Sequence, residues 1–283
     1  MTAALEQRRR AYARAMVAQL ATPDPALEDA FAAVPRESFL PPGRWVILRA
    51  PGEREVLPAP DPMRLYPLVP YPEVLVELDA ERGINNGSPS LHALMLHALS
   101  VRRGDRILHL GAGTGYYTAL LADLAGPQGR VTAVEFHDHL ARQARHNLAP
   151  WPNVRVIHGD AAAFPTDDTD RIYANFAVAD PPRAWFTWLR PGGIALLPLG
   201  TGLGRILRVE RLRHGFAAAF LMPCGFIGAS GPLAGDTAHR ARLDAAFAQG
   251  GMDAVRSLHL DPAKPRQAWF RTAGWALSPE PPA

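Results

Sequence analysis

The sequence has a single cysteine, Cys224, among its 283 residues. One thiol cannot form an intramolecular disulfide, and it excludes a metal site built from a cluster of cysteines. Chains without a disulfide framework are typical of reducing compartments. We therefore expect a cytoplasmic protein that binds no metal.

Long apolar runs and a strong charge of either sign are also missing. No stretch approaches the ~20 apolar residues that span a bilayer, so we expect no membrane partner. Lysine occurs once, at Lys264, and 30 basic residues against 27 acidic ones leave a formal charge of only +3. This small, scattered excess argues against a nucleic-acid partner. Nothing in the sequence indicates an oligomeric state.

The residues that are present indicate a folded α/β protein. Hydrophobic residues make up 48% of the chain, which is enough apolar surface to exclude a disordered polymer. The 24 glycines and 28 prolines follow no short repeat, which excludes a collagen-like or coiled-coil rod. The length suggests one large domain or one domain with substantial additions.

Three regions differ in their patterns. Residues 1–99 predict helices over 3–20 and 25–31, a proline-crowded cap over 35–72 that disfavours long regular elements, and a helix from about 90 to 99. Residues 100–215 alternate short apolar strands with helices, which predicts a doubly wound parallel sheet covered on both faces. Residues 216–283 form a C-terminal extension. The predicted elements of the central region are strands at 106–110, 130–135, 153–158, 171–175 and 194–199, and helices at 117–124, 138–148 and 182–189.

A glycine loop lies between the first predicted strand of the central region and the helix that follows it. It reads Gly111-Ala112-Gly113-Thr114-Gly115, and such glycines permit a tight turn and close approach of a ligand to the backbone. Glu135 ends the second strand, 20 residues beyond Gly115. A carboxylate at that place can accept both ribose hydroxyls of an adenosine cofactor.

The glycine spacing selects among adenosine cofactors. A dinucleotide fingerprint requires Gly-x-Gly-x-x-Gly, but here Tyr116 follows Gly115, and the Gly-x-Gly-x-Gly form is that of S-adenosylmethionine enzymes. After the third strand, Asp160 can accept from the adenine amino group, while the amide of Ala161 can meet a ring nitrogen. The alternative for Asp160 is an ordinary Asx turn or helix cap. We therefore expect S-adenosyl-L-methionine bound by Gly111, Ala112, Gly113, Gly115, Glu135, Asp160 and Ala161.

Several segments, in order, resemble the protein-L-isoaspartate O-methyltransferase family over about residues 26–215. The most specific is Val34-Pro35-Arg36-Glu37-Ser38-Phe39-Leu40-Pro41, because it lies outside the general methyltransferase core. The resemblance implies a Rossmann-like methyltransferase sheet. It also implies methyl transfer from S-adenosylmethionine to a carboxylate of a peptide or protein, with L-isoaspartyl residues as the substrate in protein repair. The other matching segments are 104–122, Val134-Glu135, Gly159-Asp160, Pro191-Gly192-Gly193 and Pro198-Leu199-Gly200.

The substrate loop departs from the family pattern. Asn85, Asn86 and Gly87 stand where the family has Thr-Ile-Ser, and Ser88 lies one residue along. Asn86 and Ser88 are the candidate substrate contacts, although Asn-Gly is also a common turn pair. Two other functions stay open. The chain could be a homologue retasked to a biosynthetic peptide or small molecule, or a non-catalytic adaptor that binds the cofactor.

The chemistry itself requires no catalytic base, because a sulfonium methyl is activated and a carboxylate is ionised at pH 7. The enzyme then needs mainly to hold the two reactants close and in line. His92 and His109 are the candidate bases for another kind of acceptor, with packing roles as the alternative for each. Cys224 has no histidine or aspartate partner in the sequence, and we expect it to be inert.

Overall fold

A computed structural model describes residues 3–50, 53–66, 74–163 and 168–282. The described chain forms two compact units that are interleaved along the sequence. Unit 1 comprises residues 1–104, 112–131 and 138–156, and unit 2 comprises residues 105–111, 132–137 and 157–283. Within the described residues, no helix combines the length and apolar character needed to cross a membrane.

Unit 1 is mainly helical and also carries a small sheet of order β2-β1-β3-β4. Two of its helices begin at side-chain caps: Asp24 accepts from the amide of Leu27 in front of α2, and Ser88 accepts from that of Leu91 in front of α3. The elements are α1 (Ala3–Val17), α2 (Pro25–Ala33), α3 (Pro89–Leu99), α4 (Tyr116–Ala125), α5 (Asp138–Asn147), the 3-10 helices η1 (Arg36–Phe39) and η2 (Pro62–Leu65), and the strands β1 (Trp45–Ala50), β2 (Glu53–Leu57), β3 (Leu75–Asp79) and β4 (Ile84–Asn85).

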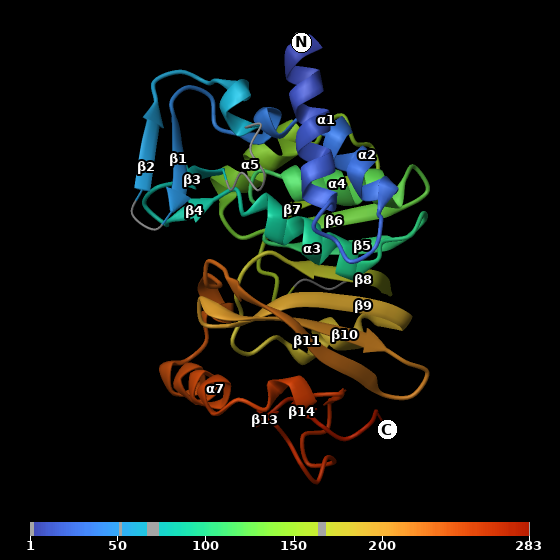
Figure 1. Cartoon of the computed structure of the whole chain (residues 1–283). Coiled ribbons are helices and arrows are strands. Elements are labelled where there is room, and N and C mark those ends of the chain that lie inside the picture. Colours follow the sequence, from blue (N-terminus) through green and yellow to red (C-terminus); the bar gives the residue numbers. More distant parts are fainter. Residues whose placement is uncertain (1–2, 51–52, 67–73, 164–167, 283) are drawn as a thin grey trace. The chain divides into compact units, whose positions relative to one another are not determined.

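Unit 2 is built on a mixed sheet of ten strands in the order β13-β14-β12-β11-β10-β9-β8-β5-β6-β7 (Figure 1). The carboxyl-terminal residues of β6 and β7 lie in this unit. The strands are β5 (Arg106–Leu110), β6 (Arg130–Glu135), β7 (Val154–His158), β8 (Thr169–Ala174), β9 (Leu189–Gly200), β10 (Leu203–Arg211), β11 (Phe216–Gly225), β12 (Ser257–His259), β13 (Phe270–Arg271) and β14 (Ala276–Ser278). The helices of unit 2 are α6 (Arg183–Thr187) and α7 (Thr237–Gln249), with the 3-10 helices η3 (Gly231–Ala234) and η4 (Met252–Ala254).

The prediction of a parallel sheet holds for only one part of it. β5 pairs parallel with β8, and β8 pairs parallel with β9. From β9 onward the pairing is antiparallel, through β10, β11, β12 and β14 to β13. Short connections join β9 to β10 and β10 to β11, which antiparallel neighbours allow, whereas residues 226–256, including α7, separate β11 from β12.

Two local predictions also change. The segment 191–193 lies inside β9 instead of ending a helix before a new strand, and Gly192 takes a φ of +82° there. The proline-crowded segment contains β1 and β2, two short strands that pair as an antiparallel hairpin. The expected boundary near residue 215 falls between β10 and β11, which are neighbours in one sheet.

The core of unit 2 explains why this sheet forms. Leu108 and Leu110 of β5 pack with Ile172 and Ala174 of β8 in one buried cluster. The same cluster includes Trp275, whose indole nitrogen donates to the carbonyl of Pro181 at 3.1 Å. Residues of the expected extension therefore share the core of the sheet that carries the predicted cofactor residues.

Candidate functional site

Three predicted cofactor segments follow the ends of three neighbouring strands in unit 2. Gly111 comes directly after β5, Glu135 ends β6, and Asp160 lies two residues beyond β7. The amide of Gly111 donates to the carbonyl of Val134 at 2.9 Å, and the amide of Gly159 donates to that of Glu135 at 3.0 Å. The sheet thus brings Gly111, Glu135 and Asp160 to one edge, where ligands of open α/β sheets bind.

The glycine loop leads from β5 into α4, and its three glycines all have positive φ. The φ values are +77° at Gly111, +57° at Gly113 and +100° at Gly115, a region that side chains disfavour. A Cβ at Gly111 would lie 2.6 Å from the ring of Phe176, and one at Gly115 would lie 2.7 Å from Leu148. Packing therefore explains those two glycines.

Gly113 differs from the glycines on either side of it. The nearest atom to a Cβ at this position is Cδ1 of Leu78, at the ordinary contact distance of 3.8 Å. Its neighbours Ala112 and Thr114 are both buried. Crowding within unit 1 therefore does not account for this glycine; its positive φ does, and the space beside its backbone would admit a ligand.

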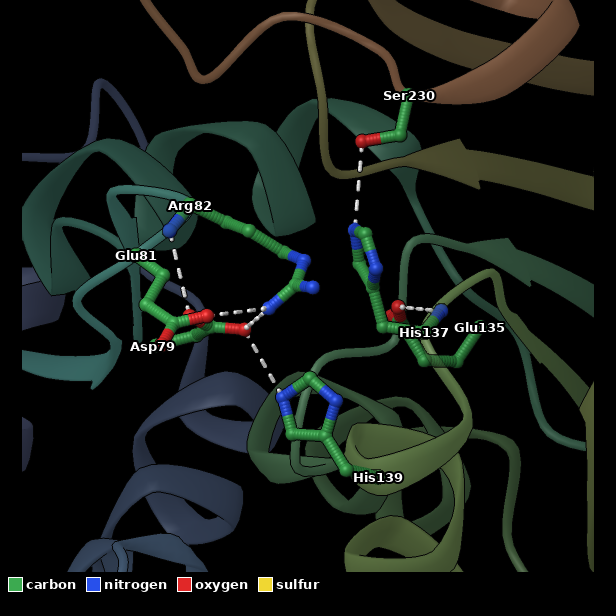
Figure 2. A network of polar contacts seen from close by, with 7 residues as sticks. All are labelled: Asp79, Glu81, Arg82, Glu135, His137, His139 and Ser230. Carbon is green, nitrogen blue, oxygen red and sulfur yellow. Dashed lines mark hydrogen bonds and ion pairs between the residues drawn. The ribbon is translucent and has the colours of Figure 1, made fainter.

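Glu135 is a buried carboxylate, with 5% of its surface exposed. One of its oxygens, Oε1, accepts from the amide of His137 at 2.9 Å, and Nε2 of His137 lies 3.3 Å from the hydroxyl of Ser230 (Figure 2). A carboxylate accepts hydrogen bonds, and the two hydroxyls of a ribose are donors that it can accept at this place. The residues present at this edge therefore fit an adenosine cofactor.

Asp160 and Ala161 form a turn after β7. Oδ1 of Asp160 accepts from the amide of Ala162 at 2.8 Å, which is the Asx turn that the sequence left open as an alternative. The carbonyl of Ala161 accepts from the indole nitrogen of Trp185 at 3.0 Å. The turn is thus fixed by its own side chain and by α6, and its position beside Glu135 is compatible with a contact to adenine.

The candidate substrate residues lie in unit 1, in a turn between β4 and α3. Asn86 is buried, and its Oδ1 accepts from the amide of Val76 at 2.8 Å. Its amide nitrogen Nδ2 has no hydrogen-bond partner among the described residues. Ser88 is the N-cap of α3, since its hydroxyl accepts from the amide of Leu91 at 3.3 Å. The structure thus gives Ser88 a local role, while Asn86 retains a donor that a ligand can satisfy.

The other reactive side chains are poorly suited to proton transfer. His92 is buried and stacks on Tyr117 with ring centroids 3.5 Å apart. Burial lowers the pKa of His109 to about 3, which makes its imidazole too weakly basic to act as a general base near pH 7. Burial raises the pKa of the Cys224 thiol to about 12, with Arg205 acting in the opposite sense. A thiol with this pKa is protonated near pH 7, which agrees with the absence of a predicted role for it.

His109 should make the protein less stable in mild acid. Its pKa is lower in the folded chain than the value of about 6.5 in an unfolded one, so the unfolded state binds more protons between about pH 3 and pH 6.5. The contribution of neutral, buried His109 to the unfolding free energy is complete above pH 6.5 and is lost as the pH falls from about 6.5 to about 3. Between pH 7 and pH 5, wild type should lose about 2 kcal/mol more unfolding free energy than the His109→Leu variant. Urea denaturation at each pH measures this difference.

The control for this experiment is His214→Leu, which removes an exposed histidine. Its stability should follow the wild-type curve at every pH. Parallel curves for wild type and His109→Leu would show that the imidazole of His109 is not kept neutral by burial.

The sheet carries the glycine loop after β5 and the carboxylate at the end of β6, the two elements expected of an S-adenosylmethionine site. The fold and the site together define a methyltransferase of the Rossmann-like class. The comparisons with known proteins place it more closely. A family model described as Protein-L-isoaspartate(D-aspartate) O-methyltransferase matches residues 62–232, which is more than half of the chain. The chain belongs to this family.

Individual relatives agree with the family model. A protein-L-isoaspartate O-methyltransferase of Ignicoccus hospitalis is 32% identical over 146 residues, which cover 50% of this chain and 69% of the relative. Enzymes of the same name from Archaeoglobus fulgidus and Rhodopseudomonas palustris are 33% and 35% identical over 132 and 145 residues, covering 45% and 49% of this chain. The chain spans only 60% and 65% of those two relatives.

Solved structures show the same fold. A protein-L-isoaspartate O-methyltransferase superposes with a TM-score of 0.66 at 22% identity, covering 80% of this chain and 67% of that one. A beta-aspartate methyltransferase of Plasmodium falciparum, solved with S-adenosyl-L-homocysteine, superposes with a TM-score of 0.61 at 15% identity and covers 78% of this chain and 98% of that one. The predicted family, Rossmann-like fold, methyltransferase class and S-adenosylmethionine cofactor are thus confirmed, whereas the site residues and the cytoplasmic location stay predictions.

Some side chains near the candidate residues were not singled out from the sequence. His137 and Ser230 contact each other beside Glu135 although 93 residues separate them, so no local pattern reveals the pair. Arg36 was quoted only as part of the family segment, but it contacts the substrate turn. The residues around Arg36 in the sequence give no signal of this contact.

Proposed function

We propose that this protein transfers the methyl group of S-adenosylmethionine to the free carboxylate of L-isoaspartyl residues in peptides and proteins. The observation that carries the proposal is the family match over residues 62–232, which includes both the substrate turn and the cofactor segments. Methylation of this carboxylate is the first step in repairing aged asparagine and aspartate residues. The relatives from three organisms carry the same name.

Each cofactor residue has a role that follows from its place. The backbone of Gly111, Ala112, Gly113 and Gly115 would hold the methionine end of the cofactor, and a side chain on Gly113 would intrude there. Glu135 accepts from the ribose hydroxyls, because its carboxylate is buried at the end of β6. Asp160 accepts from the adenine amino group, and the amide of Ala161 meets a ring nitrogen. When bound, S-adenosylmethionine supplies an electrophilic methyl group.

The chain contributes binding and exclusion of water more than proton transfer. A carboxylate substrate is ionised near neutral pH, so no group needs to remove a proton from it. The low pKa of His109 is consistent with this, since an imidazole of that kind stays neutral and takes no proton. Catalysis then comes from holding the carboxylate in line with the methyl group at close range.

Asn86 and Ser88 are the proposed substrate contacts of unit 1. The unpartnered Nδ2 of Asn86 is a donor suited to a carboxylate or to a peptide carbonyl. Ser88 holds the turn at the start of α3, so its contribution to the substrate is through the position of the backbone. The proposed partner is accordingly a protein or peptide, and the single cysteine supports a cytoplasmic location.

The function is tested with methyl-labelled S-adenosylmethionine and two peptides that differ only in an isoaspartyl or an aspartyl residue. We expect base-labile label on the isoaspartyl peptide and at most a hundredth as much on its aspartyl twin. Label only on the aspartyl peptide or on a small molecule would support the retasked homologue. Cofactor binding without transfer to any acceptor of a cell extract would support the adaptor, and either result would overturn the proposal.

A further inference from the structure

Arg36 has an unusual environment for a charged side chain. It lies in η1 with no exposed surface, and its guanidinium carbon is 5.9 Å from the ring centroid of Tyr116. Neither Nε nor Nη1 has a hydrogen-bond partner among the described residues, and Arg36 forms no ion pair with any of them. A buried charge without a counterion is costly, so its retention requires a specific contact.

The contact made by the side chain is with the substrate turn. Nη2 of Arg36 donates to the carbonyl of Gly87 at 3.3 Å, and the hydroxyl of Tyr117 donates to the same oxygen at 3.4 Å. This carbonyl belongs to the residue between the two proposed substrate contacts, Asn86 and Ser88. Two donors from η1 and α4 thus converge on the centre of the turn.

Gly87 itself has little freedom to move. Its φ is +75°, and a Cβ there would lie 2.5 Å from Nε2 of His92. Its amide donates to Oδ1 of Asn85 at 2.9 Å, while Asn86 is tied to Val76 through both its side chain and its backbone amide. The side chains of Asn85 and Asn86 fix the backbone of the turn through hydrogen bonds, and Arg36 is the charged group that contacts the carbonyl of Gly87.

The acidic neighbour of Arg36 is engaged elsewhere. Oε1 of Glu37 accepts from Arg9 at 2.6 Å, and Oε2 of Glu37 accepts from the hydroxyl of Tyr66 at 2.5 Å. The same Tyr66 hydroxyl accepts from the backbone amide of Arg36 at 3.0 Å. This network fixes the backbone of η1 and occupies Glu37, so the positive charge of Arg36 is directed to the turn without being neutralised.

We propose that Arg36 is a positioning residue for the isoaspartyl substrate: it fixes the turn Asn85–Ser88 from inside unit 1 and places a positive charge behind it. The inference rests on the proposed function, because it assigns the turn to substrate binding. A fixed turn presents the Asn86 amide in one orientation, and the buried charge favours a carboxylate over a neutral group at the same place.

The test compares Arg36→Met with Arg36→Lys, and uses Arg171→Met as the matched control. Arg171 is also buried, but its guanidinium pairs with Asp105 in unit 2, so its removal reports the loss of a buried ion-paired guanidinium that does not contact the turn. We expect Arg36→Met to raise KM for the isoaspartyl peptide at least tenfold, with kcat and the S-adenosylmethionine Kd within about threefold of wild type. Arg36→Lys keeps the charge and should raise KM only about threefold.

Hydrogen exchange of peptides covering residues 84–92 gives a readout that does not depend on activity. Exchange there should be at least tenfold faster in Arg36→Met and unchanged in Arg171→Met. An unchanged KM and unchanged exchange in Arg36→Met, or an equal rise of KM in Arg171→Met, would overturn the proposal. If Arg36→Met does not fold, Tyr117→Phe removes the second donor to the Gly87 carbonyl instead. Wild-type KM and wild-type hydrogen exchange in Tyr117→Phe would then overturn the proposal.

Failure of the two proposals can be told apart. If wild type does not methylate the isoaspartyl peptide, the proposed function is wrong, and the assignment of the turn to that substrate is wrong with it. Faster exchange in Arg36→Met would still establish the contact to Gly87 in that case. If wild type is active and Arg36→Met resembles it, only the role of Arg36 is overturned.

Discussion

Replacing Glu135 by alanine is expected to weaken the binding of S-adenosylmethionine at least tenfold, as measured by calorimetry. The variant removes a buried carboxylate at the end of β6 that accepts from the ribose hydroxyls in the proposed complex. A hydrogen bond to a charged group contributes about 1.5–3 kcal/mol, and a tenfold change in affinity corresponds to about 1.4 kcal/mol. Loss of even one such bond therefore accounts for the expected effect.

A second variant and a control make this experiment specific. Glu135→Gln keeps one acceptor oxygen but no charge, so its affinity should lie between wild type and Glu135→Ala. Glu210→Ala removes a partly exposed carboxylate that pairs with Arg208 on β10, and it should bind the cofactor like wild type. An affinity unchanged by Glu135→Ala would show that this carboxylate is not at the ribose.

Adding a methyl group at Gly113 is expected to abolish most cofactor binding while leaving the fold nearly intact. A Cβ there meets Leu78 at an ordinary 3.8 Å, so the cost to stability is the strain of a φ of +57°, about 1–2 kcal/mol. The methyl group would occupy space next to the backbone that the methionine end of the cofactor approaches. We expect the affinity of Gly113→Ala for S-adenosylmethionine to fall at least tenfold.

Two other glycines separate this effect from strain and crowding. Gly192 has a φ of +82° with no atom of the described residues within 4 Å of a Cβ, so Gly192→Ala should show the strain without a change in affinity. Gly111→Ala adds a clash with Phe176 at 2.6 Å and should lose about 3 kcal/mol of unfolding free energy. Wild-type affinity in Gly113→Ala would contradict the proposed place of the cofactor.

The cofactor half of the site was predictable because its residues are encoded locally. A short apolar strand, a glycine loop and a helix follow one another within 106–125, and Glu135 ends the next strand at a fixed spacing. Parallel strands place their carboxyl ends at one edge, so the sequence order already implied that Gly111, Glu135 and Asp160 would meet there. The positive φ values of the loop glycines are the conformations for which glycine is suited.

The substrate half was less predictable, because its contacts join distant residues. Arg36 and Gly87 lie 51 positions apart, and nothing in the residues around Arg36 reveals that its partner is a backbone carbonyl. Two of the antiparallel strands after β9 were missed because they are very short. β13 has two residues and β14 has three, which is too short for an alternating pattern to stand out.

The strand order of unit 2 has a consequence for how the chain acquires its structure during synthesis. β14 lies between β12 and β13 in the sheet, yet it is made after both of them. When β12 and β13 have left the ribosome, the strand that pairs with both of them, β14, has not yet been synthesised. The hydroxyl of Ser257 in β12 also cannot form its hydrogen bond until its acceptor, the carbonyl of Glu280, has been synthesised. A chain interrupted before residue 276 would therefore expose two unpaired strand edges, which are the features that invite aggregation and recognition by chaperones.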